Sequence, residues 1–236
     1  MNAYSVLAKY YDRLMGDFDY EGYLNFIAPE VSGEGVDLAC GSGEMTIALA
    51  KRGIKMTGVD LSREMLNCAI QKAKKNYVDV KWILQDITGL ELSHKVDFVT
   101  CVCDGVNYIE KTKLKDLFER VKTYLKDGGK FIFDISSDYK LSKIIADNLF
   151  FEDYDDVTYF WSNSLGKGYV DMDMDFFEKI KDNTYSRIGE SHRQYIYSRK
   201  EIEDLLAEWE VKVFDGESYR DVKAKSKRLI FIATKR

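Results

Sequence analysis

The run VDLACGSG at residues 36–43 joins a short apolar strand to a glycine turn, and a helical pattern begins directly after it. Glycine lets a ligand approach the backbone closely, and the first N–H groups of a following helix are unpaired. In open α/β sheets, ligands bind beyond the carboxyl ends of the strands. The run therefore predicts a strand–turn–helix unit with a ligand site at its turn.

Short apolar runs alternate with helical patterns around this unit. The predicted strands lie at 36–38, 56–59, 80–84, 96–102 and 130–135, and the predicted helices at about 44–52, 62–75 and 111–126. Two further strands, at about 210–218 and 227–234, close the chain. Strands that alternate with helices favour parallel pairing. We therefore expect an α/β fold with a doubly wound, mostly parallel seven-stranded sheet.

The pattern changes between residues 150 and 194, which we interpret as an insertion into a main domain of residues 1–149 and 195–236. Apolar residues at 170, 172, 174 and 176 alternate with aspartates at 171, 173 and 175. Strict alternation is typical of a half-buried antiparallel strand. With neighbours at 156–163 and 184–197, it predicts a three-stranded meander. At an edge, the aspartates would repel a second copy of this strand.

The overall charge favours a small-molecule partner. The 236 residues carry a formal net charge of −5, and the pI is about 5.3. Nucleic-acid-binding domains usually present a basic face. The basic cluster near the C-terminus fits a solvated strand edge that lysines protect, and it consists of Lys223, Lys225, Lys227 and Arg228. We therefore expect no nucleic-acid partner.

Cysteine usage and hydropathy point to a cytoplasmic protein. The four cysteines form no C-x-x-C pair and only two histidines accompany them, so we expect reduced thiols and no metal. No apolar stretch approaches the roughly 20 residues that cross a bilayer. Residues 1–11 lack the apolar core of a signal peptide. We expect no membrane association, and a monomer or a homodimer.

A second element sharpens the ligand prediction. Asp60 ends the strand after the glycine turn, where a carboxylate can accept hydrogen bonds from both hydroxyls of a ribose. Nicotinamide oxidoreductases and S-adenosylmethionine methyltransferases share this arrangement. The dinucleotide fingerprint requires a third small residue where Thr46 stands, and Asp37 is a poor neighbour for a pyrophosphate. Asp86 and Ile87 follow the third strand, where they can meet an adenine.

Four motifs together resemble class I S-adenosylmethionine methyltransferases: VDLACGSGEMT at 36–46, GVDLS at 58–62, QDI at 85–87 and LKDGGKFIFDI at 125–135. The resemblance implies a Rossmann-like methyltransferase fold with S-adenosyl-L-methionine as cofactor and S-adenosyl-L-homocysteine as product. It implies that Asp60 binds the ribose diol, Leu61 packs on the adenine, and Asp86 and Ile87 contact the adenine. The methionine end would be lined by Asp37, Ala39, Gly41 and Gly43.

Two more segments are similar to small-molecule methyltransferases that include sugar-amine N-methyltransferases: YYDRLM at 10–15 and CDGVNY at 103–108. The resemblance implies that the N-terminal segment folds over the cofactor and that the insertion forms a lid over the substrate pocket. It adds Tyr11, Arg13 and Cys103 to the cofactor contacts, with Arg13 on the methionine carboxylate. Sugar-amine enzymes tend to carry a histidine near 107–108, and this chain has none there.

Methyl transfer from a sulfonium is a direct displacement, for which alignment in a dry pocket supplies most of the catalysis. An amine acceptor must be neutral, so one nearby proton acceptor helps. The candidate catalytic residues are Tyr11, Asp104, Tyr108 and His192. We expect N- or O-methylation of a small molecule. The alternatives are a non-catalytic S-adenosylmethionine-binding regulator, an RNA or protein methyltransferase, and a nicotinamide oxidoreductase.

Overall fold

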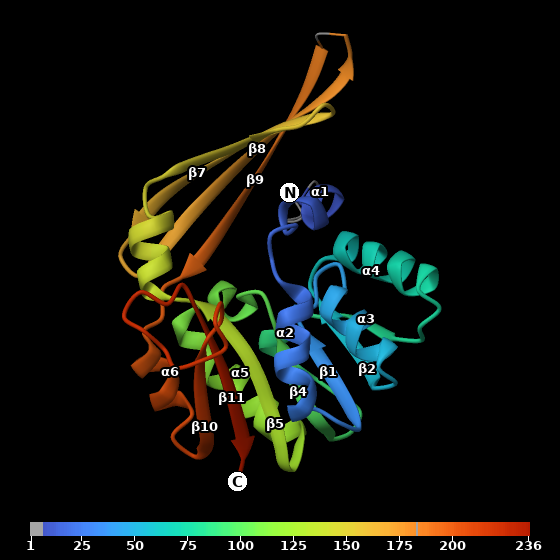
Figure 1. The fold of residues 1–236 in the computed structure, drawn as a ribbon, viewed down its shortest axis with the longest axis vertical. Helices are drawn as coiled ribbons and strands as arrows, with labels where there is room; N and C mark the ends of the chain where they lie inside the picture. Colours follow the sequence, from blue (N-terminus) through green and yellow to red (C-terminus); the bar gives the residue numbers. More distant parts are fainter. Residues whose placement is uncertain (1–6, 183) are drawn as a thin grey trace.

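A seven-stranded sheet forms the body of the protein (Figure 1), in the computed structural model that describes residues 7–182 and 184–236. Its strand order is β10-β11-β5-β4-β1-β2-β3. The strands β1 to β5 pair in parallel, and β11 is antiparallel to both neighbours. The bounds are β1 Glu34–Leu38, β2 Lys55–Asp60, β3 Lys81–Leu84, β4 Val96–Cys101, β5 Leu125–Ser136, β10 Trp209–Asp215 and β11 Arg228–Lys235. The predicted doubly wound, mostly parallel sheet is confirmed.

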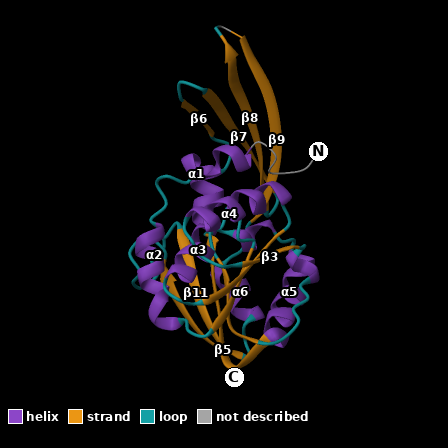
Figure 2. Ribbon diagram, turned by 90° about the vertical axis from the view of Figure 1, so that its right-hand side faces the viewer, coloured by secondary structure: helices purple, strands orange, loops and turns teal. Residues whose placement is uncertain are grey.

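Helices cover both faces of this sheet (Figure 2). They are α1 Leu7–Leu14, α2 Tyr20–Ile27, α3 Glu44–Lys51, α4 Arg63–Lys75, α5 Lys111–Tyr124 and α6 Arg199–Leu205. Four shorter helical segments are η1 Ala28–Glu30, which continues from α2, and η2 Ile87–Gly89, η3 Gly105–Tyr108 and the π-helix η4 Lys140–Ile145, which come after strands. Ser198 and Glu201 form a capping box at the start of α6. No helix among the described residues is long and apolar enough to span a membrane.

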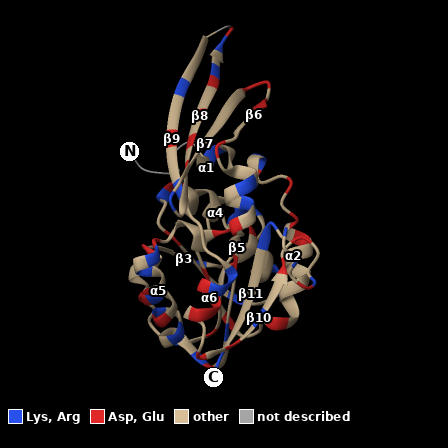
Figure 3. Ribbon diagram, turned by 90° about the vertical axis from the view of Figure 1, so that its left-hand side faces the viewer, with Lys and Arg blue, Asp and Glu red and all other residues tan. Residues whose placement is uncertain are grey.

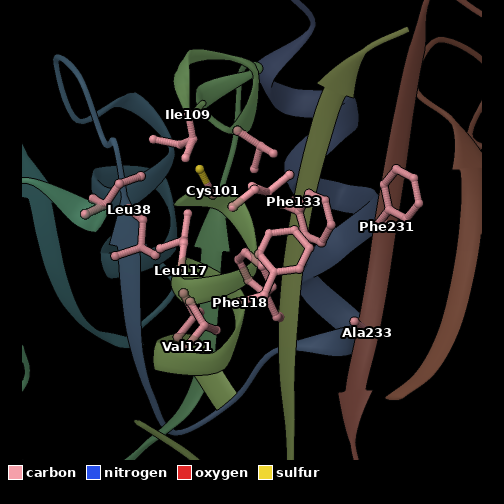
Figure 4. Close-up of a cluster of buried hydrophobic side chains, with 14 of the residues drawn as sticks. Leu38, Cys101, Ile109, Leu117, Phe118, Val121, Phe133, Phe231 and Ala233 are labelled. Atoms are coloured by element: carbon pink, nitrogen blue, oxygen red, sulfur yellow. The ribbon is translucent and has the colours of Figure 1, made fainter. Parts of the chain in front are cut away.

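The core has two layers, one on each face of the sheet. Phe131 and Phe133 of β5 pack with Phe118 of α5 on one face, and Phe133 stacks on Phe231 of β11 with ring centroids 5.0 Å apart (Figure 4). Ile132, between the two phenylalanines, packs into the other layer. Because β5 is buried on both faces, its sequence reads as a continuous apolar run.

A second, four-stranded antiparallel sheet extends away from the main sheet (Figure 1), with β6 Leu149–Asp153, β7 Val157–Gly166, β8 Tyr169–Lys181 and β9 Thr184–Tyr195 in that order. The sequence predicted three strands and missed β6. Most side chains of β6 are exposed, as Phe151 is at 62%, so β6 lacks the alternating pattern that marks a half-buried strand.

The alternation along β8 is confirmed, because residues 170, 172, 174 and 176 are buried on one face. The strand is not at an edge, however, since it lies between β7 and β9. Asp171 and Asp175 instead accept paired hydrogen bonds from Arg193 and Arg187 of β9, at 2.6–2.9 Å. Both positive and negative positions occur along β8 and β9 (Figure 3). The predicted repulsion at an edge therefore does not apply.

Helix α1 lies between the main sheet's helix α4 and the second sheet (Figures 1 and 2). Leu7, Ala8 and Tyr10 join one hydrophobic cluster with Met65 of α4 and Phe176 of β8. The Tyr10 ring stacks on Phe176 with centroids 5.8 Å apart. Burial of such side chains contributes about 1.5–3 kcal/mol each, so α1 holds the two sheets together.

Candidate functional site

A cavity of about 550 Å³ lies among the carboxyl ends of the main strands, helix α1 and the buried face of the second sheet. The second sheet contributes Trp161, Met172, Met174, His192 and Gln194 to its wall. Ten of the residues predicted for the site line it: Tyr11, Ala39, Asp60, Leu61, Asp86, Ile87, Cys103, Asp104, Tyr108 and His192. The structure thus brings together residues from both sheets and from α1.

The glycine turn positions the residues that surround this cavity. Gly41 has a φ of +52° and donates its N–H to Oδ2 of Asp60 at 2.7 Å. Gly43 has a φ of +81°, and a Cβ atom added there would lie 2.8 Å from the Trp82 ring and 2.9 Å from Cβ of Ala69. Neither glycine lines the cavity. Gly41 therefore orients the carboxylate, and Gly43 lets α4 and β3 pack closely against the turn.

Asp60 is the best-defined acid of the cavity wall. It is 8% exposed, and its Oδ1 accepts the N–H of Ser62 at 2.8 Å while Oδ2 accepts that of Gly41. Burial raises the pKa of this carboxyl, and the backbone N–H bonds oppose that rise. Each oxygen keeps a second lone pair, so the carboxylate can still accept hydrogen bonds from two hydroxyl groups.

Asp37 lies beneath the turn and not in the large cavity, contrary to the sequence prediction. Its two oxygens accept hydrogen bonds from the hydroxyls of Thr46 at 2.5 Å and Thr100 at 2.7 Å. Burial raises the pKa of Asp37 to about 6, although both hydroxyl bonds favour the charged form. It borders a separate hollow of about 20 Å³. Its donors come from α3 and β4, so its first role is to join them.

Arg13 also lies elsewhere than predicted. Its guanidinium donates to both oxygens of Asp156, at 2.6 and 3.2 Å, and it is not part of the cavity wall. Its side chain is 40% exposed. Asp156 precedes β7, so this ion pair links α1 to the second sheet. A contact with a methionine carboxylate would require Arg13 to leave Asp156, a partner 143 residues away along the chain.

The loop after β4 is held in an unusual conformation. Cys103 and Asp104 have φ values of +62° and +55°, a left-handed region that side chains other than glycine rarely adopt. Their backbone N–H groups both donate to the carboxylate of Asp134, at 2.9 Å each. Arg228 pairs with the same carboxylate. Asp134 therefore fixes the loop at the carboxyl end of β4.

Asp104 lines the cavity and is held by a network of polar partners. Its Oδ2 accepts hydrogen bonds from Ser136 at 2.8 Å and Gln194 at 3.1 Å, and Oδ1 lies 3.5 Å from Nη1 of Arg228. Burial opposes the charged form, but the positive charges of Arg228 and Lys140 hold the pKa of Asp104 at about 2. Asp104 is therefore a carboxylate at neutral pH and a weak proton acceptor.

The basic cluster near the C-terminus was predicted as solvated, and for Arg228 this is wrong. Its side chain is 11% exposed, it lines the cavity, and its guanidinium lies 5.1 Å from the Phe18 ring centroid. Arg228, Gln194 and Lys140 were missed as site residues. No sequence motif marks them. Each is brought to the cavity by an element, β11, β9 or η4, that packs against parts of the chain distant in sequence.

His192 and Tyr108 meet across the cavity wall, with perpendicular rings and centroids 6.2 Å apart. Nε2 of His192 lies 3.5 Å from Oε2 of Glu190, and both side chains are 3% exposed. The other oxygen of Glu190 accepts the N–H of Leu7 at 3.2 Å. His192 thus brings an imidazole to the wall beside Tyr108, on a strand that contacts α1.

Tyr11 closes the cavity from the N-terminal side. Burial raises the pKa of its phenol well above the ordinary value, so it is a neutral hydroxyl. Asn107, which is fully buried, donates to the carbonyl oxygens of Ser136 and Tyr195 and accepts the N–H of Ser136. This amide joins β5 of the main sheet to β9 of the second sheet.

Comparison with known proteins agrees with this geometry. The family model for a methyltransferase domain matches residues 36–129. A protein of Geobacillus sp. (strain WCH70) that is named as a methyltransferase is 34% identical over 216 residues, 87% of this chain and 87% of that protein. The crystal structure of an S-adenosylmethionine-dependent methyltransferase from Clostridium acetobutylicum ATCC 824 has a TM-score of 0.89 at 34% identity and covers 99% of both chains.

A more distant structure shares the fold. The sugar N-methyltransferase from Streptoalloteichus sp. ATCC 53650 has a TM-score of 0.81 at 15% identity, with 100% of this chain and 94% of that chain covered. The glycine turn, the buried acid that follows it and these likenesses lead to one conclusion. The chain belongs to the S-adenosylmethionine-dependent methyltransferases.

Proposed function

We propose that the protein transfers the methyl group of S-adenosylmethionine to nitrogen or oxygen of a small-molecule acceptor, by direct displacement in the cavity between the two sheets. The observation that supports this proposal is that both sheets contribute side chains to the cavity wall. Asp60 and Asp86 line one side, and Trp161, Met174 and His192 of the second sheet line the other. A wall closed by a second sheet suits a small acceptor better than a folded RNA or protein.

The residues on the main-sheet side suit S-adenosylmethionine. Asp60 keeps two lone pairs for the ribose hydroxyls, and Leu61 is 67% exposed at the cavity edge, where an adenine ring could cover it. We propose that Asp86 and Ile87 meet the adenine, and that Tyr11, Ala39 and Cys103 lie along the methionine part. The bound cofactor supplies an electrophilic methyl group on a sulfonium, which needs no further activation.

The residues on the second-sheet side would position the acceptor. Asp104 stays charged and would orient an amine or hydroxyl without taking its proton, because its pKa is about 2. We propose His192 as the group that takes the proton, since an imidazole has an acceptor nitrogen, and Tyr108 as the side chain that holds it against the acceptor. The apolar side chains of Met172, Met174 and Trp161 would exclude water from the reacting atoms.

Calorimetric titration with S-adenosylhomocysteine tests the cofactor half of this proposal, with NADH as control. One-to-one binding of the former alone is expected; binding of NADH alone would favour the oxidoreductase alternative. An acceptor screen that follows S-adenosylhomocysteine release tests the other half. Turnover on tRNA, rRNA or a protein, but on no small molecule, would overturn the acceptor class, and no turnover on any acceptor would favour a non-catalytic regulator. We propose the cytoplasm as the compartment, because all four cysteines are free.

A further inference from the structure

Among the described residues, a half-buried cation of the cavity wall has no counter-ion within 4 Å. Lys140 is the first residue of η4, which follows β5 after three intervening residues, and it lines the cavity. Within residues 7–182 and 184–236, its backbone N–H bonds to Ser137, but its ammonium group makes no hydrogen bond and no ion pair within 4 Å. Burial of an ammonium group without a close partner is unfavourable, so this position is prepared for a negative group.

Two of the acids near Lys140, Asp134 and Asp104, already have close partners in the protein. Asp134 accepts two backbone N–H groups and the guanidinium of Arg228. Asp104 accepts hydrogen bonds from Ser136 and Gln194. Burial lowers the pKa of Lys140, and the negative charges of Asp104, Asp134 and Asp17 favour its charged form against Arg228. These carboxylates thus favour the ammonium form without contacting it closely.

The position of Lys140 in the sheet separates it from the proposed cofactor contacts. Asp60 and Asp86 follow β2 and β3, whereas Lys140 follows β5, on the other side of β1 and β4. Strands lie about 4.8 Å apart, so β5 is roughly 10 Å from β1. Around η4, Leu141 and Ile145 pack with Val170 and Met172 of the second sheet. This end of the cavity is therefore on the acceptor side.

Building on the proposed function, we propose that the methyl acceptor carries an anionic group, a carboxylate or a phosphate monoester, and that Lys140 binds it. The anion would sit between η4 and the buried face of the second sheet. The guanidinium of Arg228 borders the same end of the cavity and adds positive potential there. Such an anchor would hold one end of the acceptor while its nucleophile faces Asp104, Tyr108 and His192.

The test uses the protein saturated with S-adenosylhomocysteine and two probes, sodium phosphate and sodium acetate. Thermal unfolding is followed across a titration of each probe at constant ionic strength. Three variants are compared with the wild type: Lys140→Met, Lys140→Arg, and Lys143→Met as a matched control on the exposed side of η4. We expect saturable stabilisation of the wild type by at least one probe. The apparent affinity should fall about tenfold in Lys140→Met and be retained in Lys140→Arg and Lys143→Met.

Equal stabilisation of Lys140→Met and wild type, or none of the wild type by either probe, overturns the inference. A second arm asks whether the anion is the cofactor's own carboxylate. It compares the binding of S-adenosylhomocysteine and of 5′-methylthioadenosine, which lacks the amino acid portion. If Lys140→Met weakens only the former, Lys140 holds the cofactor and the acceptor assignment fails. Failure of wild type to bind S-adenosylhomocysteine would instead count against the proposed function.

Discussion

Asp60 concentrates the cofactor chemistry in one carboxylate that two backbone N–H groups hold in place. A hydrogen bond to a charged group contributes about 1.5–3 kcal/mol. Asp60→Ala should therefore weaken S-adenosylhomocysteine binding by about tenfold or more, measured by calorimetry. Asp79→Ala is the matched control, because Asp79 is exposed and lies before β3, at the opposite end of the strands. Unchanged affinity in a folded Asp60→Ala protein would contradict the ribose assignment.

Substitution of two glycines with the same φ distinguishes the cost of backbone strain from the cost of side-chain crowding. Gly43 and Gly53 both have a φ of +81°, but an added Cβ at Gly53 meets nothing within 4 Å. Gly53→Ala should cost only the left-handed strain of about 1 kcal/mol. Gly43→Ala should cost about 1–3 kcal/mol more, since Trp82 and Ala69 must move. Urea unfolding measures both; equal losses would show that the contact with Trp82 does not limit this turn.

The buried Asp37 makes stability depend on pH in an unusual direction. Its folded pKa of about 6 lies above the ordinary value of 3.8, so the folded state binds more protons than the unfolded state between these values. As pH rises from about 4 to about 6, ionisation of Asp37 therefore lowers the free energy of unfolding, by on the order of 2–3 kcal/mol. Asp37→Asn should gain stability relative to wild type over this interval. A difference that stays constant with pH would argue against the raised pKa.

At the scale of elements, two kinds of arginine pair hold the strands. Arg193 and Asp171 are 45% and 38% exposed and join β9 to β8. Arg228 and Asp134 are 11% and 0% exposed and join β11 to β5. Exposed pairs contribute about 0–1 kcal/mol, but removing one partner of a buried pair costs about 3–5 kcal/mol. Arg193→Met should leave the free energy of unfolding within about 1 kcal/mol, and Arg228→Met should lower it by several times more. Chemical denaturation measures both changes. Similar losses of stability in the two variants would mean that the buried Asp134 carboxylate does not need Arg228 as its counter-ion.

Helix α1 is the element whose sequence says least about its position. Its residues Lys9 and Tyr10 contact Glu178, and Arg13 contacts Asp156, partners more than 140 residues away along the chain. No local pattern encodes such a distance, which is why a methionine carboxylate seemed a suitable partner for Arg13. β6 was missed for a different reason, because its apolar residues Leu149 and Phe151 are exposed and give no alternating pattern. The parallel strands were predictable, since burial on both faces leaves continuous apolar runs.

Across the whole molecule, the residues of the candidate site also divide into those that the sequence could predict and those that it could not. Asp60, Asp86 and Ile87 could be found from sequence, because the ends of parallel strands meet at one edge by rule. Lys140, Gln194 and Arg228 could not, because the π-helix η4, the second sheet and the reversed strand β11 respectively bring them to the cavity. Their register depends on pairings between segments that share no motif.

Ligand binding should couple the parts of the molecule that α1 joins. A ligand at 100 times its dissociation constant stabilises the folded state by about 2.7 kcal/mol. Because Tyr11 lines the cavity while Tyr10 packs on Phe176, S-adenosylhomocysteine should slow hydrogen exchange in residues 7–14 as well as in the glycine turn. Mass spectrometry of peptic fragments measures this. Protection confined to residues 36–87 would show that α1 closes independently of the cofactor.

The placement of His192 on the cavity wall has a practical consequence. The chain contains two histidines, and the other, His94, lies 3.0 Å from Glu34 at the start of β1, outside the cavity. The imidazole resonances of the protein therefore comprise one reporter inside the cavity and one internal reference outside it. A mixture of metabolites added to the unlabelled protein would shift the first and leave the second in place. The molecule thus offers a spectroscopic assay for its acceptor that depends on neither turnover nor a known reaction.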